Sequence, residues 1–191
     1  IKTAQEDLLS KAKGVSNEYR SSEIKNINYE FLSTLSNYQT YHGYYIKDRS
    51  FKVSDNFLAE LNNLDVENEN DFIFSQSYRS VVSSKLSNDA QEFVKKDSIA
   101  SDIAYLKSVA TIKNDKIRNK LLFDSAKYGI TYTENLEEYY SIYSKHSSDE
   151  ANNTKINADY KKLKFLSKGS ASPKFVGYEN NAGGKMSLDD L

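Results

Sequence analysis

Cysteine is absent from this chain of 191 residues, which also has one proline, seven glycines and no tryptophan. Without cysteine, the chain can form no disulfide framework, thiolate metal site, thiol nucleophile or internal dithiol exchange. Proline and glycine are the residues that most strongly interrupt helices. Because residues 1–168 contain no proline and few glycines, the sequence predicts that this part of the chain is almost entirely helical.

An excess of charge of either sign is also absent. Lys and Arg number 26 and Asp and Glu number 27, which leaves a formal net charge of -1. A near-neutral chain offers no electrostatic reason to bind nucleic acid or an anionic membrane. No apolar run approaches the roughly 18 residues that a membrane-spanning helix needs. We therefore expect a soluble chain with no nucleic-acid partner and no membrane span.

Methionine occurs once, as Met186, so Ile1 is not an initiator residue. We expect the chain to be a processed product or a piece of a longer protein. Aromatic residues, in contrast, are plentiful, with 15 tyrosines and 9 phenylalanines. Aromatic side chains bury large areas, and the sequence therefore predicts a helical core rich in tyrosine.

Apolar residues recur at steps of three and four after Ser21, which is typical of one face of a long amphipathic helix. The stripe comprises Ile24, Ile27, Phe31, Leu35, Tyr38, His42 and Tyr45. Ser54 or Asp55 is predicted to cap a short helix that presents Phe57, Leu61 and Leu64. Residues 65–71 are predicted to form a polar acidic connection, and residues 72–86 to continue as helix.

Capping-box patterns, in which Ser or Thr is followed three residues later by Glu, predict further helix starts. The pairs are Thr3 with Glu6, Thr131 with Glu134 and Ser147 with Glu150, and Asn88 with Gln91 gives a related pattern. Ile117, Leu121 and Leu122 predict a helix that ends near Gly129. The tetratricopeptide signature of Trp, Gly, Tyr and Pro is missing. The expected fold is mostly α, either a multi-helix bundle or a helical-hairpin array, with a short extended hairpin at the C-terminal end.

Residues with catalytic or metal-binding potential do not fall in any recognised spacing. His42 and His146 are far apart in sequence; His42 lies on the apolar stripe and is interpreted as a packed side chain, and a charged His146 would suit a helix C-terminus. Asp65, Glu67, Glu69 and Asp71 alternate as in a calcium loop. That loop requires glycine at its sixth position and Glu at its twelfth, where Gln76 stands. We interpret the segment as a solvated acidic loop, and we predict no catalytic residue, metal or cofactor.

An aromatic cluster is predicted at the end of the long helix, where Tyr41, Tyr44 and Tyr45 flank Gly43. Such a cluster can stack on a sugar or anchor a protein partner. In the other interpretation, one side of the cluster packs in the core and the rest covers a surface. Both interpretations remain open from the sequence.

The composition changes at Lys168, after which four of the seven glycines and the only proline occur. Residues 166–191 combine a Gly-x-x-Ser-Pro-x-Phe pattern, a glycine-rich turn and a Ser-Leu-x-x-Leu sequence. This segment, about one eighth of the chain, resembles the opening of TlpA/ResA-like thiol-disulfide oxidoreductases of the AhpC/TSA-type thioredoxin-fold family. The matching positions are Gly169, Ser172, Pro173, Phe175, Gly184, Ser187, Leu188 and Leu191.

The resemblance implies a division into two parts, a helical accessory domain over 1–167 and a truncated start of a thioredoxin-like domain over 168–191. In the family, an apolar strand and a Trp-Cys-x-x-Cys motif follow, so no redox residue carries over onto this chain. The resemblance also implies a location in the periplasm or cell envelope of a Gram-negative bacterium. Taken without the rest of its sheet, the hairpin is expected to be weakly ordered or to dock on the helices.

Two functional hypotheses follow. The first is a non-catalytic helical accessory region of an envelope thiol-disulfide oxidoreductase, whose partner is another protein or the missing thioredoxin-like domain. The alternative is a helical binding module that holds a glycan or peptide with its exposed tyrosines. An enzyme with a site built from scattered polar residues is disfavoured, because no nucleophile, base and orienting group occur together.

Overall fold

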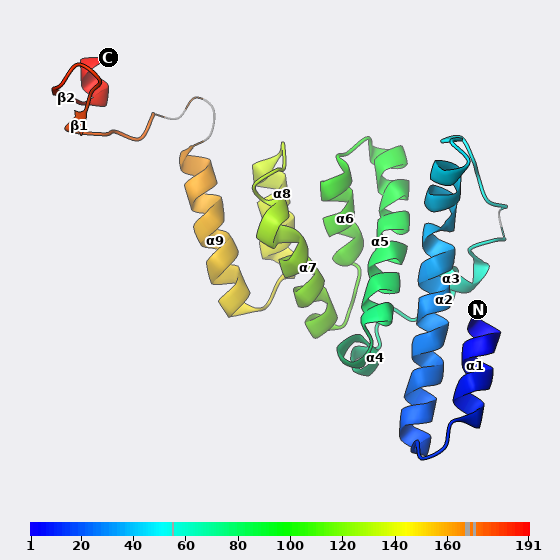
Figure 1. The fold of residues 1–191 in the computed structure, drawn as a ribbon. Coiled ribbons are helices and arrows are strands. Elements are labelled where there is room, and N and C mark those ends of the chain that lie inside the picture. Colours follow the sequence, from blue (N-terminus) through cyan, green and yellow to red (C-terminus); the bar gives the residue numbers. More distant parts are fainter. Residues whose placement is uncertain (55, 167–168, 170) are drawn as a thin grey trace.

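The structure is a computed structural model that describes residues 1–54, 56–166, 169 and 171–191. It is 67% helical, and a short two-stranded antiparallel hairpin follows the helices (Figure 1). The expected mostly-α fold with a C-terminal hairpin is thereby confirmed. The predicted boundary at Lys168 and the predicted cap at Asp55 lie outside the described residues.

The helices and strands follow in chain order within the described ranges. They are α1 (Lys2–Lys11), α2 (Asn17–Tyr45), α3 (Ala59–Asn62), α4 (Glu69–Phe74), α5 (Gln76–Asp97), α6 (Ser101–Val109), α7 (Asp115–Gly129), α8 (Leu136–His146), α9 (Glu150–Phe165), β1 (Tyr178–Glu179) and β2 (Lys185–Met186). A 3-10 turn at Leu188–Asp190 closes the chain.

Helices α1, α2, α5 and α6 lie side by side in a row, and α7 and α8 continue it together, since both contact α6 and both contact α9, the last helix (Figure 1). Helices α2 and α5 run parallel, since Asn26 meets Ser75 near their starts and Leu32 meets Val81 further along. Parallel neighbours need a long return connection, which here is residues 46–75. Helices α5 and α6 form an antiparallel pair, in which the Ser108 hydroxyl donates to the Leu86 carbonyl over 2.9 Å. The sequence left two arrangements open, a multi-helix bundle or a helical-hairpin array. The structure is closer to the array, although α2 and α5 are parallel and therefore do not form a hairpin.

Tyrosine supplies the largest buried side chains, as the composition predicts. Tyr78, Tyr139 and Tyr143 are at most 1% exposed. They belong to one cluster that spans α4 to α9, and a smaller cluster of Leu32, Leu61 and Val81 joins α2 to α3 and α5. Apolar packing therefore extends from α2 to α9, because the partly buried Tyr29 and Leu64 pack against both clusters, whereas α1 has no buried residue.

The N-cap residues of α7, α8 and α9 are Asn114, Asn135 and Asp149. The side chain of each accepts a hydrogen bond from a backbone N–H of the first helical turn. The predicted capping boxes at Thr131 and Ser147 are therefore wrong by a few residues, because Asn and Asp cap as well as Ser and Thr. Helix α1 begins at Lys2, before Thr3, and has no side-chain cap.

The predicted helix start at Asn88 is also wrong. Asn88 lies inside α5, which continues to Asp97. Leu86 and Ala90, on either side of Asn88, are each 2% exposed. Their packing keeps this turn helical despite the modest helix propensity of Asn.

The apolar stripe of α2 packs only in its middle. Ile27 and Leu32 are buried, and Phe31 and Leu35 pack beside them. Ile24, Tyr38 and Tyr45 are 46%, 39% and 79% exposed, which corrects the expectation of one continuous buried face. The C-terminal turns of α2 therefore present aromatic side chains to solvent.

Gly129, the last residue of α7, lies against the buried ring of Tyr139. A Cβ atom at Gly129 would lie 2.5 Å from the Tyr139 hydroxyl oxygen. We expect Gly129→Ala to lower the free energy of unfolding by about 1 to 3 kcal/mol, because the ring must shift within a packed core. Urea unfolding measures this change. Tyr139→Phe in the same background should recover part of the loss, and a fully additive double variant would contradict the contact.

Candidate interaction surfaces

The three tyrosines singled out from the sequence lie on the last turns of α2 and are strongly exposed. Tyr41, Tyr44 and Tyr45 are 62%, 76% and 79% exposed, and the adjacent Ile46 is 48% exposed. The rings of Tyr44 and Tyr45 meet edge to face, with centroids 5.7 Å apart. We call Tyr41, Tyr44, Tyr45 and Ile46 the tyrosine surface.

A second aromatic group lies beside the tyrosine surface, and its rings pack against one another. The His42 ring stacks on Tyr38 at 5.0 Å and lies 4.6 Å from Phe51, measured between ring centroids. Phe57 also contacts Tyr38, at 5.2 Å. His42 is therefore a packed side chain, as predicted. Its contact with Phe51 holds the residues after α2 against the helix.

A close backbone approach ends α2 at this point. The Asp48 N–H donates to the Gly43 carbonyl over 2.9 Å, and Lys47 adopts a left-handed φ of 57°. A Cβ atom at Gly43 would lie 2.8 Å from the Asp48 carbonyl oxygen, so the turn requires glycine there. The turn leaves a cleft of about 490 Å³ beside the tyrosine surface, which we call the α2-end cleft. Its lining residues are Gln39, Thr40, Gly43, Tyr44, Lys47, Asp48, Arg49 and Phe51.

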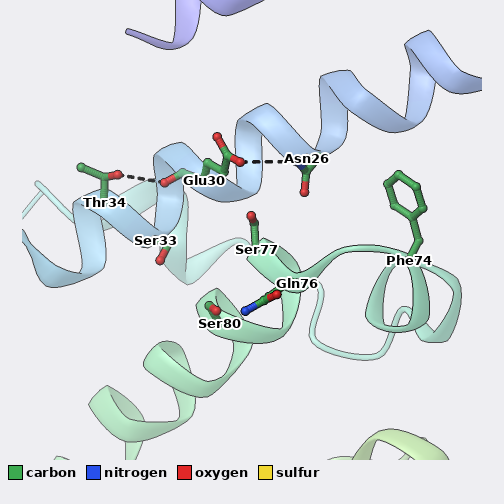
Figure 2. A pocket seen from close by; sticks show the side chains of 8 residues that line it. All are labelled: Asn26, Glu30, Ser33, Thr34, Phe74, Gln76, Ser77 and Ser80. Atoms are coloured by element: carbon green, nitrogen blue, oxygen red, sulfur yellow. Dashed lines mark hydrogen bonds between the residues drawn. The ribbon is translucent and has the colours of Figure 1, made fainter.

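A second, more polar cleft of about 640 Å³ lies between α2 and α5 (Figure 2). Hydroxyl, amide and carboxylate groups line it, with Phe74 at one end as the only aromatic side chain. The lining residues are Asn26, Glu30, Ser33, Thr34, Phe74, Gln76, Ser77 and Ser80. The cleft follows from the parallel packing of α2 on α5, and no sequence motif marks it.

The acidic segment 65–71 is not a solvated loop, which corrects the sequence-based interpretation. Asp71 is 6% exposed and accepts bonds from three side chains. The Tyr29 hydroxyl donates over 2.6 Å, the Asn68 amide over 2.9 Å and the Lys25 ammonium over 3.1 Å. Burial, followed by the hydrogen bond to Asp71 and the charge of Asp71, raises the pKa of Tyr29 well above its ordinary value. The carboxylate therefore joins α2 to α4.

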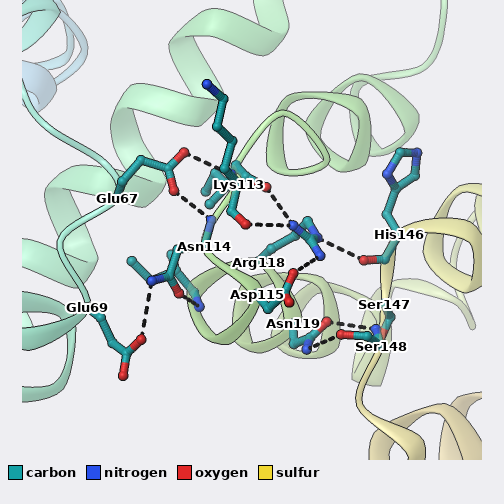
Figure 3. Close-up of polar contacts among 12 residues, drawn as sticks. Glu67, Glu69, Lys113, Asn114, Asp115, Arg118, Asn119, His146, Ser147 and Ser148 are labelled. Carbon is teal, nitrogen blue, oxygen red and sulfur yellow. Dashed lines mark hydrogen bonds and ion pairs between the residues drawn. The ribbon is translucent and has the colours of Figure 1, made fainter.

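Glu67 and Glu69 bind the start of α7 (Figure 3). The two oxygens of Glu67 accept the backbone N–H groups of Lys113 and Asn114 over 2.8 and 2.7 Å. Glu69 accepts from the Lys116 ammonium over 2.6 Å, which, with Asn114, lowers the pKa of Glu69. A carboxylate at a helix N-terminus is favoured by the helix dipole. Within the described residues, no group of three or more His, Cys, Asp or Glu is placed to hold a metal ion.

Arg118 extends this network to the end of α8. Its guanidinium donates to the His146 carbonyl over 2.9 Å and to the Ile112 carbonyl over 2.9 Å, and it pairs with Asp115 (Figure 3). Burial, with the charges of Lys145 and Arg118, lowers the pKa of His146 below its ordinary value. This shift disfavours the charged form of His146 that the sequence-based interpretation placed at the helix C-terminus.

In the C-terminal segment, some residues of the motif found in the sequence contact one another. Tyr178 pairs with Met186 and Glu179 with Lys185 in the hairpin, and Gly184 lies in the connecting turn. The Leu188 N–H donates to the Phe175 carbonyl over 3.0 Å. Gly169 and Pro173 precede these contacts and belong to neither strand.

Local polar contacts that sequence reasoning missed hold this segment. Ser187 and Asp190 form a reciprocal capping box around the 3-10 turn. The Asn180 side-chain oxygen accepts from the N–H groups of Ala182 and Gly184 inside the hairpin turn. The Ser-Leu-Asp-Asp sequence contained the signal for the capping box, since Ser followed three residues later by an acid is the expected pattern.

Comparisons with protein-family models, with curated proteins and with solved structures give no match to this chain. Among the helices of the described ranges, none combines the length and apolarity needed to cross a bilayer.

Removing the charge of Glu67 is expected to weaken the junction between segment 65–71 and α7. Glu67→Gln keeps one acceptor oxygen but loses the other and the charge, so the free energy of unfolding should fall by about 1 to 2 kcal/mol. Urea unfolding measures the change. The matched control is Glu60→Gln, on an exposed side chain, and an equal loss in both variants would contradict the assigned role.

Tyr78 should make the structure sensitive to alkaline pH. Burial is the main cause that raises the pKa of Tyr78 to about 12, and its hydroxyl donates to the Asp65 carbonyl over 2.6 Å. A raised pKa in the folded state stabilises the fold fully below about pH 10, and that contribution is lost as pH rises toward 12 at about 1.4 kcal/mol per pH unit. The difference in unfolding free energy between the wild type and Tyr78→Phe should therefore narrow above pH 10. The exposed Tyr132→Phe is the control, and a constant difference across this range would contradict the prediction.

Proposed function

We propose that the helical array is a non-catalytic accessory region that positions a thioredoxin-like domain of an envelope thiol-disulfide oxidoreductase. The observation that carries the proposal is the local fold of the C-terminal segment. Its hairpin and its capped turn occur in the order in which the resembled family begins its redox domain. The Leu188 N–H donates to the Phe175 carbonyl, and the Gly177 N–H donates to the Ser187 hydroxyl oxygen, so the Ser-Leu sequence contacts the part of the segment around Phe175.

The array suits a positioning role because polar contacts brace it at several junctions. Asp71 joins α2 to α4, Glu67 joins the return connection to α7, and Arg118 joins α7 to the end of α8. A scaffold fixed in this way can hold an attached domain at a defined distance from a bound partner. The proposed role needs no catalytic group in the helices.

A second candidate is a binding module that acts through the tyrosine surface. The specific observation in its favour is that three tyrosines, each more than 60% exposed, gather on one end of α2. Exposed tyrosines of this kind are enriched in protein interfaces. The two candidates are compatible, because a region that positions a redox domain can do so by binding the partner of that domain.

The coding sequence beyond Leu191 tests the first proposal. We expect an apolar strand followed by Trp-Cys-x-x-Cys, and the protein made from that gene should reduce protein disulfides in the presence of a dithiol. Replacing either cysteine by serine should abolish the activity. Deleting residues 1–166 should leave the reduction of a small disulfide unchanged, because the chemistry belongs to the dithiol domain. An immediate stop codon, or a downstream sequence without a dithiol motif, would refute this proposal and leave the binding module.

A further inference from the structure

We infer that the α2-end cleft binds a peptide segment that carries a carboxylate beside an aromatic or aliphatic side chain. The lining of the cleft combines two aromatic side chains, Phe51 and Tyr44, with two cations, Lys47 and Arg49, next to the tyrosine surface. This inference names a ligand class for the binding role proposed above, and it does not depend on whether a redox domain follows.

Phe51 lines the cleft because Gly43 lets the chain after α2 fold back closely against the helix. Phe51 lies against Gly43, with its Cβ atom 3.5 Å from the position that a Gly43 Cβ would take. The Gln39 side-chain oxygen accepts the Val53 N–H over 3.1 Å and ties the same segment to α2. Phe51 and the exposed Tyr44 thus both line this cleft of about 490 Å³ and offer aromatic surface to a side chain of a ligand.

The charge around the cleft is positive. No Asp or Glu occurs between Phe31 and Lys47, and residues 46–53 contain Lys47, Arg49 and Lys52 against the single carboxylate of Asp48. That carboxylate is already engaged, since it accepts from the Ser50 N–H over 2.8 Å and from the Ser50 hydroxyl over 2.6 Å. These bonds lower the pKa of Asp48, so it remains ionised and bound within its own turn.

Lys47 and Arg49 have no carboxylate partner in the part of the chain that the structure describes. Lys47 also adopts the left-handed backbone conformation that favours glycine at a helix end. Both Lys47 and Arg49 line the cleft, so their charges face a bound ligand. A ligand carboxylate placed between the two cations supplies the missing partner.

The small local excess of positive charge favours a peptide with one or two carboxylates over a nucleic acid. The cleft lies at the helix C-terminus, where the dipole is negative by about half an elementary charge. Two cations against this background suit one or two carboxylates, whereas a phosphate backbone needs a larger excess of positive charge. The chain as a whole has a formal charge of -1. The adjoining tyrosine surface adds contact area for the apolar residues of a peptide.

The test is a titration of the isotopically labelled chain with acetyl-Glu-Phe-Glu-Leu-amide, followed by backbone and Arg side-chain resonances. We expect shifts at Gly43, Tyr44, Phe51 and the Arg49 guanidinium. The uncharged acetyl-Gln-Phe-Gln-Leu-amide should bind about tenfold more weakly, as two exposed ion pairs are lost. An oligothymidylate serves as the nucleic-acid probe.

The informative variant combines Lys47→Gly with Arg49→Gln. It removes both cations while glycine relieves the left-handed backbone, so misfolding does not explain a loss of binding. Affinity for the acidic peptide should fall about tenfold. The matched control, Lys13→Gln with Lys161→Gln, removes the same charge from exposed lysines elsewhere and should leave affinity unchanged.

Three results overturn the inference: equal binding of the acidic and uncharged peptides, unchanged affinity in the Lys47 and Arg49 variant, or tighter binding of the oligothymidylate. None of these results bears on the redox proposal, which the disulfide-reduction assay tests separately. Loss of that activity would likewise leave the peptide titration unaffected, so the two proposals fail independently.

Discussion

The buried carboxylate of Asp71 holds the first long helix to the rest of the array. It accepts bonds from Lys25 and Tyr29 of α2 and from Asn68 at the start of α4. A buried charge is tolerated only when donors of this kind surround it. Because α2 and α5 are parallel, no tight turn can align them, and the return connection must supply the alignment. The contacts of Asp71 supply this alignment. They thereby also determine where the C-terminal end of α2, which carries the tyrosine surface, lies in the array.

The same connection explains why acidic residues gather between positions 65 and 71. Asp71 turns toward α2, and Glu67 turns toward the start of α7, so that one short segment fixes helices on both of its sides. The helix dipole of α7 favours Glu67, while the donors Lys25 and Tyr29 favour Asp71. The alternating acidic residues that resemble a calcium loop thus make contacts within the protein, with α2 on one side and with α7 on the other. The polar cleft lies between α2 and α5, whereas the α2-end cleft lies between the last turns of α2 and the residues that follow them.

Much of the helical content could be predicted from the sequence, because helix periodicity and the scarcity of proline and glycine are local properties. The helix predicted from Ile117 and Leu121, with its end near Gly129, was correct for that reason. The start proposed at Asn88 failed because tertiary packing of Leu86 and Ala90 outweighs a local capping preference. The burial of Asp71 was not predictable, since two of its three side-chain donors, Lys25 and Tyr29, are 46 and 42 residues away. Likewise, the tyrosines at the end of α2 could be identified from their positions in the sequence. The cleft beside them could not, because it depends on how the chain folds back at Gly43.

The position of the tyrosine surface has a consequence for how the two proposals fit together. Figure 1 draws the C-terminal hairpin beyond α9, at the opposite end of the row from α2. A partner bound at the α2-end cleft would therefore lie a full row of helices away from the start of an attached domain. A partner must then be large or extended to reach both. A flexible peptide segment of a protein substrate satisfies this requirement, because the array can hold the segment at one end while a disulfide in the same substrate reaches the other. The geometry thus favours a protein with an acidic extended segment over a small ligand as the partner of this array.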